Sequence, residues 1–95
     1  MAEGAVAEVQ RGDILIFPST TIEFTLRTAG EVRLEVYNSL GERVAVLASG
    51  YYEAGEHMFA WHATNDRGMP LPSGVYFARM QAGDYFATHR MMLLK

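Results

Sequence analysis

Three histidines are the side chains of this sequence best suited to acid–base or metal chemistry, and their spacing argues against both. They are His57, His62 and His89. His57 and His62 are five residues apart in a segment that alternates like a β-strand, so their side chains point to opposite faces. A zinc site needs ligands that converge from one side, and the chain has no cysteine to supply thiolates. The histidines are interpreted as surface or rim residues, and no metal or other cofactor is predicted.

No nucleophile stands in a pattern that is typical of catalysis. There is no serine in a GxSxG elbow, and Ser73 in "PSG" is more simply a turn residue. Residues 64–68, "TNDRG", offer clustered oxygen atoms, but they lack the alternating acids and the distal glutamate of a calcium loop. The same Asn, Asp and Gly are what a tight turn requires. We therefore predict a domain that is not an enzyme and has no catalytic residues.

Tyrosines and one tripeptide are the remaining candidates for ligand binding. Tyr37, Tyr51 and Tyr52 would form an aromatic platform for a sugar ring if they converged, although tyrosines beside glycines equally often pack as a lid over the end of a sandwich. The tripeptide "RGD" at 11–13 is used in cell adhesion when it is displayed on a loop, and it is more simply a turn sequence. Carbohydrate binding and adhesion thus stay open as alternatives.

Length and charge exclude other classes of partner. A chain of 95 residues is enough for one domain. Its net charge is -3 and its arginines are scattered rather than clustered, so nucleic acid is not expected as a partner. No run approaches the ~20 apolar residues of a membrane span, and the first residues lack the basic start and apolar core of a signal peptide. If the domain is exported, its signal is expected to lie upstream.

Apolar and polar residues alternate with period two along most of the chain, which predicts an all-β domain. Residues 50–57 are expected to form an irregular bend. Tyr76 follows a long linker and is expected to act as a tyrosine corner, with its hydroxyl bonded to the backbone of that linker. The number and spacing of the segments predict an antiparallel immunoglobulin-like or fibronectin-III-like sandwich of about seven strands. The predicted strands are 14–17, 21–26, 31–38, 43–49, 57–62, 75–82 and 85–94.

The order of several short motifs resembles a known family. The motifs are "VYNSLGERV" at 36–44, "GEHMFAW" at 55–61, "DRGMPLPSGVYF" at 66–77 and "HRMMLLK" at 89–95. Their order over 18–95 is similar to that of the C-terminal sorting domains of the type IX (Por) secretion system and of the related Ig-like domain of the flagellar hook-capping (FlgD) protein. Residues 1–17 are then an N-terminal extension or a first strand. One departure is Trp61-His62-Ala63, where the family often carries an acid and a glycine.

The resemblance implies a domain at the end of a larger exported protein. It would pass through the periplasm and be recognised by secretion-apparatus proteins at the outer membrane, leaving the linked cargo domain secreted or at the cell surface. Unpaired strand edges are ready docking templates, and they would also allow a homodimer. A carbohydrate-binding or adhesion module and a structural assembly domain, as in a hook cap, are the alternatives. The residues expected to contact the apparatus are Gly41, Arg43, Pro72, Gly74, Tyr76, Arg90, Met91, Leu93 and Lys95.

Overall fold

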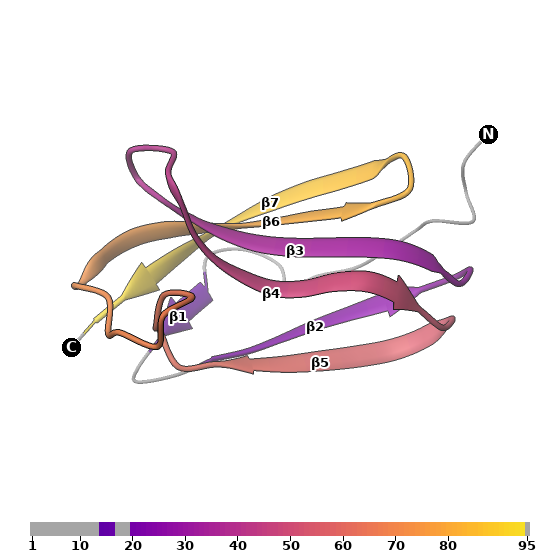
Figure 1. The fold of residues 1–95 in the computed structure, drawn as a ribbon, viewed down its shortest axis with the longest axis horizontal. Coiled ribbons are helices and arrows are strands. Elements are labelled where there is room, and N and C mark those ends of the chain that lie inside the picture. The colour runs from indigo at the N-terminus through magenta and orange to yellow at the C-terminus, as the bar shows by residue number, and fades with distance from the viewer. Residues whose placement is uncertain (1–13, 17–19, 95) are drawn as a thin grey trace.

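The computed structural model describes residues 14–16 and 20–94, and it shows a sandwich of two β-sheets (Figure 1). The prediction of an all-β sandwich of about seven strands is confirmed. Among the residues described, no helix is long and apolar enough to cross a membrane. The strands are β1 (Ile14–Ile16), β2 (Thr20–Leu26), β3 (Gly30–Asn38), β4 (Arg43–Tyr52), β5 (Gly55–Trp61), β6 (Gly74–Ala82) and β7 (Tyr85–Leu93).

Five strands form one sheet in the order β1-β7-β6-β3-β4, and β2 and β5 form the other. Every pairing is antiparallel except that of β1 with β7, which is parallel and places Ile14 opposite Met91. The expectation of a wholly antiparallel sandwich is wrong at this one pairing. A parallel pair needs a long connection, and β1 and β7 satisfy this because the rest of the sandwich separates them along the chain.

Period-two alternation places the core as the sequence predicts. In β2, Ile22, Phe24 and Leu26 are buried, whereas the threonine and glutamate side chains between them are exposed. In β6, Tyr76, Ala78 and Met80 face inward in the same way. The apolar faces of the two sheets therefore meet in one core, to which both sheets contribute.

The boundaries of β4 differ from the prediction. Gly50 and Tyr52 were expected in a bend, but they lie in β4, with Gly50 opposite Val32 of β3. The bend is confined to the short turn at 53–54 between β4 and β5. Pairing with β3 outweighs the weak strand preference of glycine here, and a register shift between Leu34 and Glu35 accommodates an extra residue of β4.

The two ends of the sandwich carry different connections. We call "the loop end" the end with the turn 39–42, the linker 62–73 and Leu94, which lies at the left in Figure 1. We call "the far end" the opposite end, with the short turns 27–29, 53–54 and 83–84. The residues expected to contact a secretion apparatus fall mainly at the loop end.

Candidate recognition surface

Two aromatic side chains hold the linker against the core at the loop end. The hydroxyl of Tyr76 donates a hydrogen bond of 2.7 Å to the carbonyl oxygen of Pro72. Burial raises the pKa of this phenol. The indole Nε1 of Trp61 donates to the carbonyl oxygen of Thr64 at 3.0 Å, and the two rings pack edge to face at 6.3 Å. The predicted tyrosine corner is confirmed, and both ends of the linker are fixed to the core.

The "TNDRG" segment is a turn that docks on the edge of β4. The Asp66 amide donates to the Val44 carbonyl at 3.1 Å, and the Asp66 carboxylate accepts from the Val46 amide at 2.9 Å. The side-chain oxygen of Asn65 accepts from the amides of Arg67 and Met69. These oxygen atoms hold backbone, and no group of three or more potential metal ligands exists among the residues described. The turn interpretation is confirmed.

Ala63 takes a backbone conformation that favours glycine, the residue type that the sequence analysis associates with this part of the resembled family. It has a φ of 60°, in the left-handed region that favours glycine, and its carbonyl accepts the Leu71 amide at 2.9 Å. A residue with a β-carbon is strained in this conformation by about 1–2 kcal/mol. At position 63 the linker therefore takes a conformation that would be less strained with glycine than with the alanine that this chain carries.

Asn38 fixes the other element of the loop end, the turn between β3 and β4. Its side-chain oxygen accepts from the amides of Leu40 and Glu42 at 3.0 and 2.9 Å. Its side-chain nitrogen donates to the Glu42 carboxylate at 2.8 Å, and Gly41 takes a φ of 85°. The Asn38 side chain thus supports a turn that two backbone hydrogen bonds also hold, and Leu40 is left exposed to solvent.

The structure separates the predicted contact residues into two groups. Gly41, Arg43 and Pro72 are exposed at the loop end, Gly74 is half-buried there, and Arg90 is exposed on the outer face of the five-stranded sheet. Tyr76, Met91 and Leu93 are buried in the core, where a partner cannot reach them while the domain is folded. Lys95 lies outside the described residues, as does the "RGD" tripeptide at 11–13.

The final strand is not an open edge over its last residues. β1 pairs with Met91–Leu93 on the side of β7 that faces away from β6. Met91 and Leu93, which were predicted to contact a partner, therefore lie in a part of β7 that is paired on both sides. Alternation indicates which side chains point inward, but it does not reveal which strands are neighbours.

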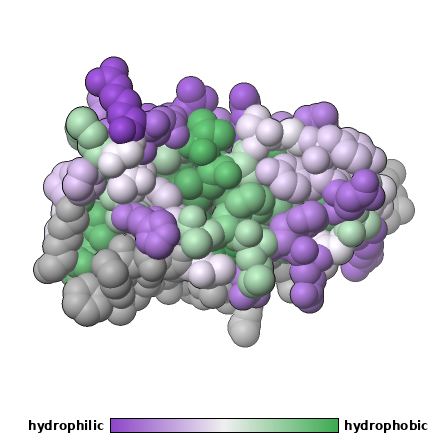
Figure 2. All heavy atoms as spheres, turned by 60° about the horizontal axis from the view of Figure 1, so that its bottom comes forward, coloured by the Kyte–Doolittle hydropathy of each residue, from purple (hydrophilic) through white to green (hydrophobic). Residues whose placement is uncertain are grey.

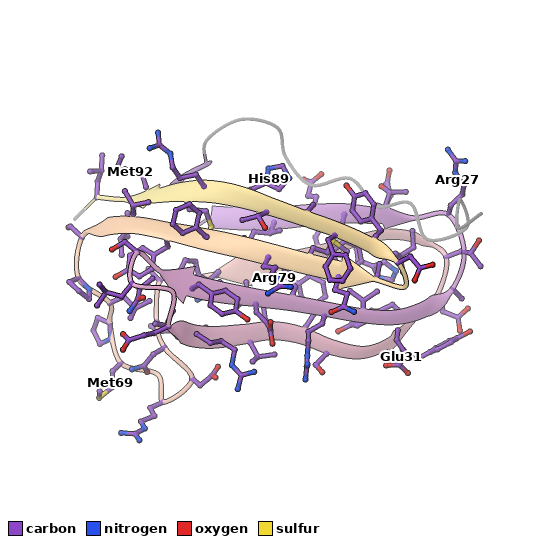
Figure 3. The ribbon with its side chains drawn as sticks, turned by 90° about the horizontal axis from the view of Figure 1, so that it is seen from above. Arg27, Glu31, Met69, Arg79, His89 and Met92 are labelled. Atoms are coloured by element: carbon purple, nitrogen blue, oxygen red, sulfur yellow. The ribbon has the colours of Figure 1, made fainter. Side chains whose placement is uncertain are left out.

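The loop end displays three large apolar side chains that sequence reasoning missed. Leu40 is 82% exposed, Met69 52% and Leu94 46%. Met69 extends from the linker at this end of the molecule in Figure 3. Figure 2 shows a different gathering of hydrophobic side chains, across the middle of one face with hydrophilic ones around it. Two of these residues could have been found in the sequence, because Leu40 and Met69 are apolar residues within segments rich in Asn, Gly and Pro.

The three tyrosines do not form one sugar platform. Tyr51 and Tyr52 are consecutive residues of β4, so Tyr51 is exposed while Tyr52 packs against Phe24 with ring centroids 6.1 Å apart. Tyr37 and Tyr51 share the outer face, but their register partners in the β3–β4 pair place them about 20 Å apart along the strands. The convergence that sugar stacking needs is absent from this set.

His57 is a rim residue of the core. Its ring centroid lies 5.2 Å from those of both Phe24 and Tyr52. Its Nε2 atom is 2.7 Å from the carbonyl oxygen of Glu53. His62 is exposed just beyond β5 and His89 is half-buried on β7. The three rings therefore belong to three separate environments.

Comparison with known proteins identifies the fold and the family. The model of the FlgD Ig-like domain matches residues 17–85. The chain is similar to part of a dimeric, latent PorU from Porphyromonas gingivalis, with a TM-score of 0.71, 19% identity, and coverage of 94% of this chain and 9% of that one. It is similar to FlgD from P. aeruginosa, with a TM-score of 0.64, 20% identity, and coverage of 93% and 71%.

A third neighbour is PorZ of Porphyromonas gingivalis, described as an essential bacterial surface component of the type IX secretion system. Its TM-score is 0.55 at 15% identity, with coverage of 94% of this chain and 11% of that one. No match was found among the curated proteins. The chain spans only a small part of PorU and PorZ, and FlgD-type Ig-like domains are typically non-catalytic modules. The chain belongs to the FlgD Ig-like domain family.

Proposed function

We propose that this chain is a non-catalytic domain of a larger exported bacterial protein. The type IX secretion apparatus recognises it and carries the protein across the outer membrane to the cell surface. The observation that most supports this is the likeness, over 94% of the chain, to parts of PorU and of PorZ, a component of that system. The chain spans 9% and 11% of these proteins, which is in keeping with a module of a longer chain.

The loop end is the surface that we assign to recognition. Its two loops are held by Asn38, Asn65, Asp66 and Tyr76, so they present a fixed shape to a partner. Preorganised loops lose less conformational entropy on binding, and exposed apolar side chains supply binding free energy when a partner covers them. This surface keeps the predicted residues Gly41, Arg43, Pro72 and Gly74 and replaces Met91 and Leu93 by Leu40, Met69 and Leu94.

The function is tested by fusing the 95-residue chain to the C-terminus of a periplasmic reporter. The fusion is expressed in a bacterium with a type IX system and in the same strain without its outer-membrane translocon. We expect the reporter at the surface or in the medium of the first strain and in the periplasm of the second. Retention in both strains, or export from both, contradicts the proposal.

A triple variant tests the recognition surface. Leu40→Asp, Met69→Asp and Leu94→Asp together should lower export by about tenfold or more, because each buries less apolar area against the partner and adds a charge there. The control is Met58→Asp with Tyr51→Asp, which adds two charges at exposed residues away from the loop end, and it should export normally. Urea unfolding checks that both variants fold.

Normal export of the folded triple variant would move recognition to another surface without refuting secretion itself. Deletion of 91–95 is not a usable variant, because Met91 and Leu93 are fully buried and pair with β1. Loss of export after that deletion would report unfolding rather than lost recognition.

A structural role in an assembly, as in a hook cap, is the second candidate. It is favoured by the FlgD family match and by the coverage of 71% of FlgD from P. aeruginosa. Light scattering at increasing protein concentration tests it. Reversible self-association together with no type IX-dependent export would select this function, whereas a strict monomer counts against it. No observation favours carbohydrate binding, because the tyrosines do not converge.

A further inference from the structure

The outer face of the five-stranded sheet carries much of the positive charge of an otherwise acidic chain. The chain has a net charge of -3, yet Arg33, Arg43, Arg79 and Arg90 all belong to this face. Strand register explains the gathering: Arg33 and Arg79 lie on the outward positions of β3 and β6, and Arg90 lies opposite the outward Phe77. The face is thus basic in its middle.

Among the described residues, Glu35 is the one buried carboxylate of this face, and three donors share it. Glu35 is 7% exposed. Its Oε1 accepts a 2.8 Å hydrogen bond from the Tyr37 hydroxyl, and its Oε2 lies 3.1 Å from Nη1 of Arg43 and 3.4 Å from Nε of Arg33. A buried carboxylate is retained only when partners satisfy it. Glu35 therefore sets one negative charge against the two positive charges of Arg33 and Arg43, and no contact joins it to Arg79.

Arg79 does not share the Glu35 carboxylate with Arg33 and Arg43, although Glu35 is its register partner on β3. Among the described residues it forms no ion pair. Its guanidinium instead lies 5.6 Å from the ring centroid of the exposed Phe86, a cation–π contact that holds it in place. Figure 3 shows Arg79 in the middle of this face, with Glu31 toward the far end.

A shallow depression of about 330 Å³ adjoins Arg79. Its walls are the rings of Tyr37 and Phe77, and Thr88 and the turn after β3 complete it. Asn38 already occupies the turn amides of Leu40, Gly41 and Glu42 through its two oxygen atoms. Those amides are therefore not available as an anion-binding nest for a phosphate. What remains is a single planar guanidinium beside an aromatic surface.

We propose that this depression binds a carboxylate side chain from an extended acidic segment of a partner protein. Arg79 pairs with the carboxylate, because guanidinium and carboxylate match in geometry and charge. The aliphatic neighbour of the acid packs against Tyr37 and Phe77. The depression adjoins the loop end, because Ser39 and Gly41 of the turn 39–42 also line it. The proposal stands on the charge of Arg79 on the sheet face, and its test measures peptide binding rather than export.

The test is an NMR titration of the ¹⁵N-labelled full chain with a blocked peptide of sequence Leu-Glu-Val-Glu. The amides around Tyr37, Phe77, Arg79 and Thr88 should shift on titration, and added salt should weaken the effect. The matching peptide with glutamine in place of both glutamates should bind about tenfold more weakly, since it keeps shape and loses charge. Equal binding of the two peptides would overturn the proposal.

Two variants, each of which removes one positive charge, show where the peptide binds. Arg79→Gln should weaken the acidic peptide by about tenfold, and Arg27→Gln, an exposed arginine in a far-end turn, should leave its affinity unchanged. Both substitutions are on the surface, so the folded chain remains available for titration. Equal weakening by the two variants would mean a diffuse charge effect and would overturn the site.

Two further arms of the titration address other occupants of the depression. Inorganic phosphate that shifts the same amides as strongly as the peptide would overturn the carboxylate assignment. Shifts of these amides that appear on concentration of the chain alone would assign the depression to a second copy of the chain, and would overturn the proposal of a different partner.

Discussion

The loop end and the far end of the sandwich solve the same connection problem in different ways. At the far end, turns of two or three residues join the strands, and His57 is the only side chain that bonds to a turn backbone among the described residues. At the loop end, four side chains bond to the backbone of the connections, namely those of Asn38, Trp61, Asn65 and Tyr76. The side chain of Asp66 in the linker bonds to the backbone of β4 at Val46. The short turns of the far end show that strands can be joined without the side-chain hydrogen bonds found at the loop end.

The linker of the loop end is costly to order. Each ordered backbone residue loses about 1–2 kcal/mol of conformational free energy, so a linker over 62–73 is expensive to fix. Side-chain hydrogen bonds offset part of this cost at the end that also exposes Leu40, Met69 and Leu94. Long, fixed loops with exposed apolar tips are typical of a surface that binds a partner. The comparison supports the proposal that the loop end is the binding surface, and three substitutions test whether side chains brace its loops.

Replacing the residue of β5 that braces each end should give the largest difference. Trp61→Ala should lower the free energy of unfolding by about 3–5 kcal/mol, because it leaves a cavity and removes the bond to Thr64. His57→Ala at the far end should cost about 1–2 kcal/mol, since its ring is half-buried. Urea unfolding measures both. Equal costs would mean that the loop end is no more dependent on its braces than the far end.

The corner tyrosine should give an intermediate effect. Tyr76→Phe should lower the free energy of unfolding by about 1–2 kcal/mol, because it leaves the Pro72 carbonyl without its donor. Tyr52→Phe is the matched control, because the Tyr52 hydroxyl makes no hydrogen bond among the described residues, and it should be nearly neutral. Both variants keep the ring. A loss of the same size in the two would contradict a bracing role for the corner.

The pH dependence of the same pair sharpens this result. Burial raises the pKa of Tyr76 above its ordinary value of 10.0, so the folded state favours the neutral phenol. The stability that this phenol contributes is fully present below pH 10.0 and is lost as the pH rises through the folded-state pKa. The stability difference between the wild type and Tyr76→Phe should therefore shrink above that pH, and a difference that grows would contradict the assignment.

Local features of this fold were predictable from the sequence, and long-range ones were not. Alternation placed Ile22, Phe24 and Leu26 in the core, and the linker before Tyr76 predicted its corner, because both depend on neighbouring residues. The pairing of β1 with β7 joins residues at opposite ends of the chain, so no local pattern indicates it. Met91 was predicted to contact a partner, whereas its side chain is buried in the core and its backbone is paired with β1.

The same limit applied to the candidate surfaces. Strand register, which the sequence does not reveal, brings Arg79 beside Glu35 and Thr88 on the outer face. The turn at Asn65 and Asp66 was recognised from its residue types, but its docking on the edge of β4 depends on how far the linker folds back. A turn predicted from composition thus proved to have a second role as cover for an edge strand.

Loss of the Asp66 contact with the edge of β4 should have the smallest and most local effect on stability. Asp66→Ala should lower the free energy of unfolding by about 1 kcal/mol, because the Val46 amide loses its acceptor at the edge of β4. Asp84→Ala in a far-end turn removes an exposed carboxylate without a partner among the described residues and should be nearly neutral. Hydrogen exchange locates the change: the Val46 amide should exchange faster in Asp66→Ala alone. If the Val46 amide stays protected, the linker does not seal that edge, and the difference between the two ends rests on the aromatic braces instead.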